Sequence, residues 1–137
     1  MQRKQRRCFK LAQKAVTTIL AKKKMLLARA GKIELPPIKQ MVFGSGGVDE
    51  GGMVIEPETG QQELNNELYR KDISSIEIVS DTQIRYTCLL DEDELEDEEI
   101  SELALADADG DLLTIKNFKA KGKDGDFTFT FKINDTM

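Results

Sequence analysis

The segment "EISELALADADGDLLTIKNFKAK", residues 99–121, predicts a β-hairpin that turns at Asp109-Gly110. Aspartate and glycine suit such a turn, because aspartate forms local side-chain hydrogen bonds and glycine tolerates positive φ. We therefore expect a small, mainly antiparallel β-sheet around this hairpin.

Four other segments alternate apolar and polar side chains, which indicates half-buried strands. The clearest is "DGDFTFTFKIN" (124–134), which places its phenylalanines on one face. "SIEIV" (75–79) and "QIRYTCLL" (83–90) predict a second hairpin, and "IKQMVF" (38–43) predicts a further strand. In "QELNNELYRKD" (62–72) the leucines lie four residues apart, so that segment suits a short helix or turn.

Residues 6–30, "RRCFKLAQKAVTTILAKKKMLLARA", predict an amphipathic helix, because apolar residues recur at three- and four-residue steps with lysines between them. Gly31 suits the left-handed residue that ends a helix, and Pro36-Pro37 prevents its continuation. Such a helix either packs on the body of its own domain or docks onto an acidic partner. The predicted fold class is therefore α+β, a long N-terminal amphipathic helix followed by a small mainly antiparallel β-sheet domain.

The 137 residues are enough for one domain, which divides by charge into two parts. Residues 1–35 contain 11 Lys or Arg and one acid, whereas the remainder contains 9 basic residues and 24 acids. We expect a basic helical arm over 1–34 and a β-rich body over 35–137. Within the body, 44–63 reads as an exposed glycine-rich loop, and 91–99, with eight acids in nine residues, as a solvated acidic loop.

Several kinds of site are excluded by composition and spacing. The sequence has no histidine, the commonest general base and transition-metal ligand. Its two cysteines, Cys8 and Cys88, lie in unlike contexts and are expected to be reduced. "GSGGVDEGG" lacks the Gly-Lys-Ser/Thr of a phosphate-binding loop and is followed by acids. No membrane span, cofactor or small-molecule substrate is expected, and the chain reads as non-enzymatic.

"DADGD" (107–111) resembles the opening of a calcium-binding loop. An EF-hand needs glycine at its sixth position and glutamate at its twelfth, and here those positions hold Leu112 and Phe118. A hairpin turn accounts for the motif without metal, although weak calcium binding by the aspartates at 107, 109 and 111 stays open.

The order of these segments resembles the amino-terminal domain of phage tail-collar and tail-fibre proteins. The resemblance covers residues 12–134, through "LLARAGKIELPPIKQMVFGSGG", "LNNELYRKDI", "IEIVSDTQIRYTCLL", "ISELALADADGDLLTIKNF" and "KGKDGDFTFTFKI". In that family the domain attaches the fibre to the tail baseplate. A repetitive shaft and a receptor-binding tip usually follow there, whereas this sequence stops at Met137, so direct host recognition is not expected of it. The resemblance assigns a glycine turn, a polar motif and an I-x-E-x-x-L-x-D-x-x-G hairpin to Gly44, Gly46, Gly47, Asn66, Glu67, Arg70, Ile100, Glu102, Leu105, Asp107 and Gly110.

We therefore expect a structural protein of a phage tail or a related contractile particle, made in the bacterial cytoplasm and built into the baseplate or the fibre attachment. Its partners would be other tail or baseplate subunits, a separate fibre protein and further copies of itself. The predicted partner-binding residues are apolar anchors with a cationic rim: Phe9, Leu11, Val16, Ile19, Leu20 and Leu27, with Lys22, Lys23, Lys24 and Arg29.

Two alternatives from other classes stay open. In the first, the basic arm binds nucleic acid through its phosphates, as a virion accessory protein would. Aromatic side chains for base stacking are nearly missing from the arm, and the acidic body would repel a polyanion. In the second, the aspartates at 107, 109 and 111 make the chain a calcium-dependent binding module.

Overall fold

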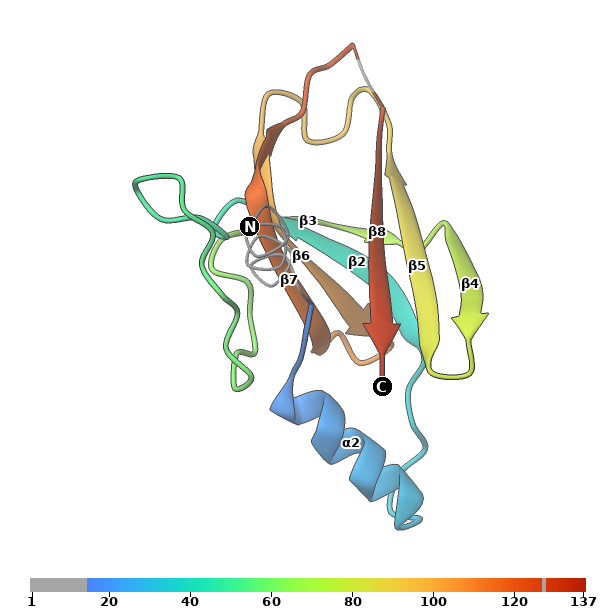
Figure 1. The fold of residues 1–137 in the computed structure, drawn as a ribbon. Coiled ribbons are helices and arrows are strands. Elements are labelled where there is room, and N and C mark those ends of the chain that lie inside the picture. Colours follow the sequence, from blue (N-terminus) through green and yellow to red (C-terminus); the bar gives the residue numbers. More distant parts are fainter. Residues whose placement is uncertain (1–14, 127) are drawn as a thin grey trace, which may run out of the picture.

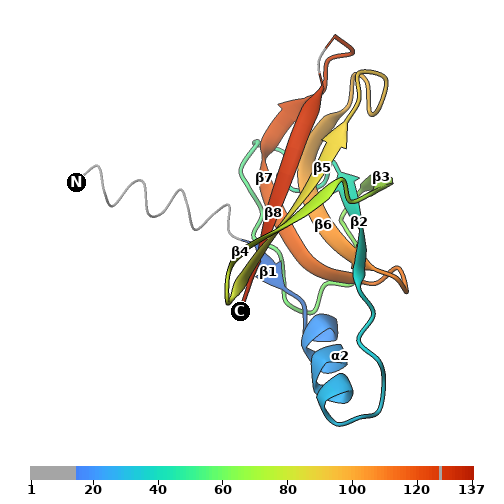
Figure 2. The same cartoon turned by 90° about the vertical axis from the view of Figure 1, so that its right-hand side faces the viewer.

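Strands are the predominant regular structure in the computed structural model, which describes residues 15–126 and 128–137 (Figure 1; Figure 2). Five strands form one antiparallel sheet in the order β1-β7-β6-β2-β3, and three form a second in the order β4-β5-β8. In chain order the elements are β1 Val16–Thr17, α2 Ile19–Arg29, β2 Ile38–Gly44, β3 Glu67–Asp72, β4 Ser75–Ser80, β5 Gln83–Leu90, β6 Glu99–Asp107, β7 Leu112–Gly122 and β8 Phe129–Thr136.

The predicted α+β fold with a long N-terminal amphipathic helix is wrong. The described residues are mostly β, with two antiparallel sheets and one helix of 11 residues. Residues 6–14 of the predicted helix lie outside the described residues, and Val16–Thr17 form a short strand paired with β7. The β-branched Val16 and Thr17 favour the extended backbone that pairs with β7, and the Thr18 side chain caps the helix, so the helix begins only at Ile19.

The predicted end of the helix is confirmed. Gly31 has a φ of 76°, and its amide donates to the carbonyl of Ala28. The Lys32 amide reaches back to the Leu27 carbonyl at 2.9 Å, which closes the last turn in the manner of a Schellman motif.

The predicted strands and both hairpins are confirmed, with small shifts at their ends. β4 pairs with β5, and β6 pairs with β7, both antiparallel. β8 covers the second half of the predicted segment 124–134, extends to Thr136, and pairs with β5. The short helix or turn predicted for 62–72 is wrong, because this segment contributes β3. Its pairing with β2 at the edge of the sheet outweighs the local spacing of its leucines.

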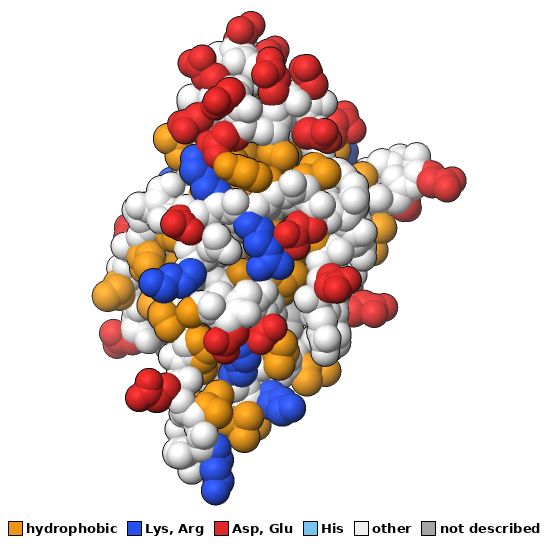
Figure 3. All heavy atoms as spheres, turned by 180° about the vertical axis from the view of Figure 1, so that it is seen from behind, with side chains coloured by type: hydrophobic (Ala, Val, Ile, Leu, Met, Phe, Trp, Pro, Cys, Tyr) orange, Lys and Arg blue, Asp and Glu red, His pale blue; other side chains and the backbone are white. Residues whose placement is uncertain are grey.

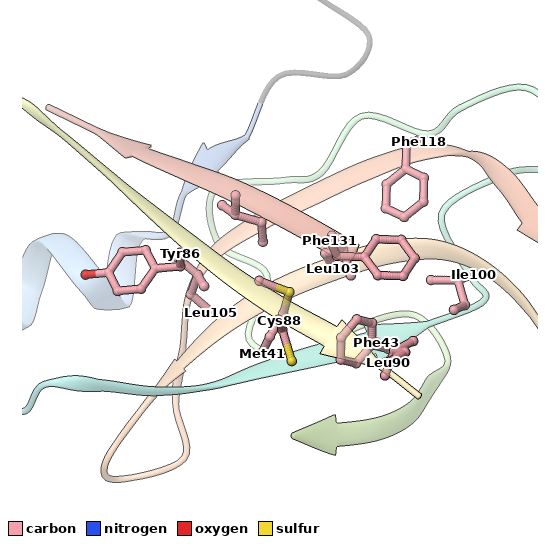
Figure 4. Close-up of a cluster of buried hydrophobic side chains, with 11 residues drawn as sticks. Met41, Phe43, Tyr86, Cys88, Leu90, Ile100, Leu103, Leu105, Phe118 and Phe131 are labelled. Atoms are coloured by element: carbon pink, nitrogen blue, oxygen red, sulfur yellow. The ribbon is translucent and has the colours of Figure 1, made fainter. Parts of the chain in front are cut away.

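The main core lies between the two sheets (Figure 4). Side chains from β2, β5, β6, β7 and β8 meet there, and the Phe131 ring packs edge-on against Phe43 with their centroids 5.4 Å apart. Cys88 is a free, buried cysteine in this core, and burial raises the pKa of its thiol. The buried members are Met41, Phe43, Tyr86, Cys88, Leu90, Ile100, Leu103, Leu105, Phe118, Phe131 and Ile133.

A second, smaller core covers the outer face of the five-stranded sheet. Leu64, from the long connection between β2 and β3, packs there with side chains of β2, β6 and β7. The Ile55 carbonyl in the same connection accepts a hydrogen bond from the Asn117 side chain at 2.7 Å. This connection, drawn in green in Figure 1, therefore covers part of the sheet.

The acidic segment 91–99 joins β5 to β6 at the opposite end of the molecule from α2 (Figure 1). Most of its carboxylates are exposed, and acidic side chains gather at that end in Figure 3. Glu94 departs from this pattern: it is partly buried and accepts hydrogen bonds from the Tyr69 hydroxyl and the Lys71 ammonium. The Lys71 ammonium also lies 3.7 Å from an Asp91 carboxylate oxygen, so the start of the segment is tied to β3.

Candidate docking surface

The start of α2 is fixed to the first residues of β7 by Thr18. Its hydroxyl donates to the Leu112 carbonyl at 3.0 Å and accepts from the Ala21 amide at 3.1 Å, which caps the helix. The Thr18 amide also donates to the Leu113 carbonyl. Because these bonds hold one end of the helix on the sheet, its orientation is set independently of any partner.

The middle of α2 is held by Lys24, which reaches the turn between β6 and β7. Its Nζ lies 2.6 Å from a carboxylate oxygen of Asp107, 2.6 Å from one of Asp111 and 3.2 Å from one of Asp109. The Asp107 side chain has no exposed area, whereas the Asp109 side chain is 63% exposed. Burial alone lowers the pKa of Lys24, but the hydrogen bonds to the three carboxylates outweigh it, and the pKa is raised above its ordinary value.

This arrangement gives the "DADGD" motif a cation from its own chain. Carboxylate oxygens of the three aspartates lie within 4.8 Å of one another, which is close enough to hold a metal ion. The Lys24 ammonium lies among them, so a metal ion would have to displace it. The backbone amides of Asp109 and Asp111 donate to the other oxygen of Asp107, which fits the local hydrogen bonding predicted for the turn.

The opposite face of α2 carries exposed apolar and basic side chains together. Ile19 is 57% exposed and Leu26 is 62% exposed. Lys22, Lys23 and Arg29 are exposed at the intervening three- and four-residue steps, so they share this face with the two apolar residues. In Figure 3 orange and blue side chains alternate at the lower end of the molecule. We call Ile19, Lys22, Lys23, Leu26 and Arg29 the outward face of α2.

The predicted partner-binding residues fall into four groups. Phe9 and Leu11 lie outside the described residues. Val16, Leu20 and Leu27 are partly buried, with Val16 paired opposite Ile115 of β7. Lys24 is held inside the molecule. The structure leaves Ile19, Lys22, Lys23 and Arg29 exposed together on α2.

Sequence reasoning missed two exposed apolar residues that follow α2 in the chain. Ile33 and Leu35, in the connection from α2 to β2, are 38% and 51% exposed. Their signal was weak: two apolar residues in a short connection bounded by Gly31 and the prolines. Leu26 belonged to the apolar pattern of the helix but was not among the predicted anchors.

A second polar cluster, centred on Glu102 of β6, explains the glycine turn. The Glu102 carboxylate is fully buried and accepts three backbone hydrogen bonds, from the amides of Gly46, Asn65 and Asn66, each at 2.8 Å. A Cβ on Gly44 would lie 2.4 Å from a Glu102 oxygen. The loop therefore needs glycine in order to approach this carboxylate, and its role is structural.

The remaining polar motif also makes internal contacts. Arg70 donates two hydrogen bonds to the Glu67 carboxylate, at 2.8 and 3.1 Å, and a third to the Gly110 carbonyl at 3.0 Å. These bonds link β3 to the turn between β6 and β7. The Asn66 side chain donates to the Ser45 hydroxyl at 2.6 Å, which joins the two ends of the long connection.

Comparison with known proteins identifies one family. The family model described as "Phage tail-collar fibre protein, N-terminal" matches residues 11–127. No curated protein and no solved structure gives a match. Among the described residues, no helix has the length and apolar character needed to span a membrane.

Proposed function

Because this chain belongs to the phage tail-collar fibre protein family through its N-terminal domain, we propose that it docks a fibre onto the tail baseplate through the outward face of α2. A structural role in the phage tail fibre, among other tail proteins of the virion, follows from the family itself. The finer proposal is a non-enzymatic assembly role, with several copies in each particle.

The observation that carries this proposal is the exposure of Ile19 and Leu26 beside three cations on a helix already fixed to its own domain. Exposed apolar side chains in the centre of a surface provide most of the affinity of an interface, and charges at its rim select the partner. The rim here is positive, so the partner would be an acidic face of a neighbouring subunit. Phe9 and Leu11 stay predicted as further anchors.

The test is incorporation of variants into tail particles. Leu26→Glu keeps a good helix former at an exposed position, so the free protein should fold normally while incorporation falls at least about tenfold. Lys22→Glu combined with Lys23→Glu should reduce incorporation more strongly at low salt than at high salt. Quantitative mass spectrometry of purified particles measures both effects.

Met53→Glu provides the matched control, because Met53 is 67% exposed in the connection between β2 and β3, outside the α2 surface. It should enter particles at the wild-type level. Normal incorporation of Leu26→Glu, or an equal loss with Met53→Glu, would refute docking through α2.

A further inference from the structure

A groove runs between β7 and β8, on the side of the molecule where strands of different sheets lie next to each other. Its volume is about 440 Å³. The floor is aromatic: Phe118 and Phe129 each pack against Phe131, with centroids 6.1 and 6.0 Å apart. The rim carries Lys116, Lys121 and Lys132.

Both strands that flank this groove have free backbone edges among the described residues. Within residues 15–126 and 128–137, β1 covers β7 only opposite Val16 and Thr17, which leaves the edge from Lys116 to Gly122 without a strand partner there. β8 pairs with β5 on one side, and no described strand pairs with its other side. An extended segment entering the groove would therefore find unpaired strand edges as well as an apolar floor.

The rim lysines have no carboxylate partner in the described part of the chain. Residues 1–14 and 127 contain no aspartate or glutamate, so they cannot supply one. Burial, together with the charge of Lys121, lowers the pKa of Lys116. In a protein with a net charge of −5, these lysines form a local excess of positive charge.

We propose that this groove binds an extended acidic segment of another tail protein, which adds as a strand along β7 and places alternate apolar side chains on the phenylalanines. Its carboxylates would pair with the rim lysines, and its backbone would use the free edge. This surface is separate from the outward face of α2 and supplies a second contact.

The same chemistry argues against two other occupants. Residues 1–14 precede β1 but contain six Lys or Arg, so they would add positive charge to a positive rim. Nucleic acid has no backbone amides and carbonyls that could extend a sheet, so it would leave the free edges of β7 and β8 unpaired. An acidic, partly apolar peptide satisfies both the lysines and the floor.

The test uses the full chain and a fluorescein-labelled synthetic heptapeptide of alternating glutamate and valine, followed by fluorescence anisotropy at physiological ionic strength. We expect saturable binding that weakens with added salt. Lys121→Glu and Lys132→Glu should each lower the affinity by roughly tenfold. The counterpart peptide with lysine in place of glutamate should not bind.

Lys119→Glu is the matched control, because it makes the same charge change on an exposed residue of the same strand that does not line the groove. It should change the affinity by less than about twofold. The proposal would be overturned if Lys119→Glu lowered the affinity as much as the rim variants do, or if a thymidine oligonucleotide competed with the peptide. It would also be overturned if the folded full chain did not bind the peptide. So would concentration-dependent self-association that Lys121→Glu abolishes and Lys119→Glu preserves, since a second copy would then occupy the groove. Leu26→Glu should bind the peptide normally, which separates this result from a failure of docking through α2.

Discussion

Replacing Lys24 with methionine should destabilise the fold strongly, because it leaves a buried carboxylate without its cation. Methionine keeps a long, unbranched side chain, so the change removes charge with little change in packing. The Asp107 side chain has no exposed area, and the Lys24 side chain is 11% exposed. The variant must therefore bury or protonate an uncompensated aspartate.

The expected loss is about 3 kcal/mol in the free energy of unfolding, the lower part of the range for breaking one partner of a buried ion pair. The lower part applies because Asp107 keeps two backbone hydrogen bonds on its other oxygen. A loss of that size would lower the melting temperature by about 10 to 15 °C in a domain of this length. Asp109→Asn should cost at most about 0.5 kcal/mol, because that carboxylate is largely exposed.

Urea denaturation at neutral pH, followed by circular dichroism, measures these differences. The Lys24 contribution is complete there: since the pKa is raised, it is lost only as the pH rises above the ordinary lysine value of 10.5. Combining Lys24→Met with Asp107→Asn should cost less than the sum of the two single changes. A loss below about 1 kcal/mol for Lys24→Met, or an equal loss for Asp109→Asn, would refute the reasoning. Calcium should raise the melting temperature of Lys24→Met but not of the native chain, because only the variant frees the three carboxylates.

Three further changes test the rest of the fold. Glu102→Gln should cost about 3 kcal/mol in urea denaturation, because an amide cannot accept all three backbone hydrogen bonds equally, while the exposed Glu99→Gln should cost almost nothing. Gly47→Ala should cost about 1 to 3 kcal/mol, because its Cβ would lie 2.0 Å from a backbone carbonyl oxygen of β6, whereas Gly60→Ala meets no atom within 4 Å and should be near neutral. Burial raises the pKa of Glu94, but hydrogen bonds, first from the Asp91 backbone, lower it to about 2. The contribution of the Glu94 carboxylate to stability is therefore complete above pH 4.5 and is lost as the pH falls toward 2. In an acid titration of stability, Glu94→Gln should lack this loss.

The alternation of apolar and polar residues was sufficient to predict a strand wherever one face of that strand is buried. The alternation in 83–90 predicted the buried face of β5, because Tyr86, Cys88 and Leu90 all lie in the core. The same reasoning predicted the hairpin of β6 and β7 and the termination of α2 at Gly31. These features depend on side-chain period and backbone conformation within a few residues, which a sequence displays directly.

Long-range pairing decided what the pattern left ambiguous. A three- and four-residue apolar spacing suggested a helix over 6–30 and a turn over 62–72, but strand partners drew Val16–Thr17 and Glu67–Asp72 into the large sheet. The helical spacing of a short segment is a weak constraint compared with the backbone hydrogen bonds of a sheet. The partner strand of each segment is distant in the sequence, so the local pattern does not reveal it.

The sequence by itself determined β2, the hairpin of β4 and β5, the hairpin of β6 and β7, β8 and the family, because each is written in short periodic motifs. Only the tertiary structure decided that Lys24 turns inward while Leu26 stays exposed. The physical reason is that the three aspartates come from a turn more than 80 residues away, and one of them, Asp107, is buried and would carry an uncompensated charge without the ammonium. Of the predicted partner-binding residues, the outward face of α2 keeps Ile19, Lys22, Lys23 and Arg29, and the structure adds Leu26 to them.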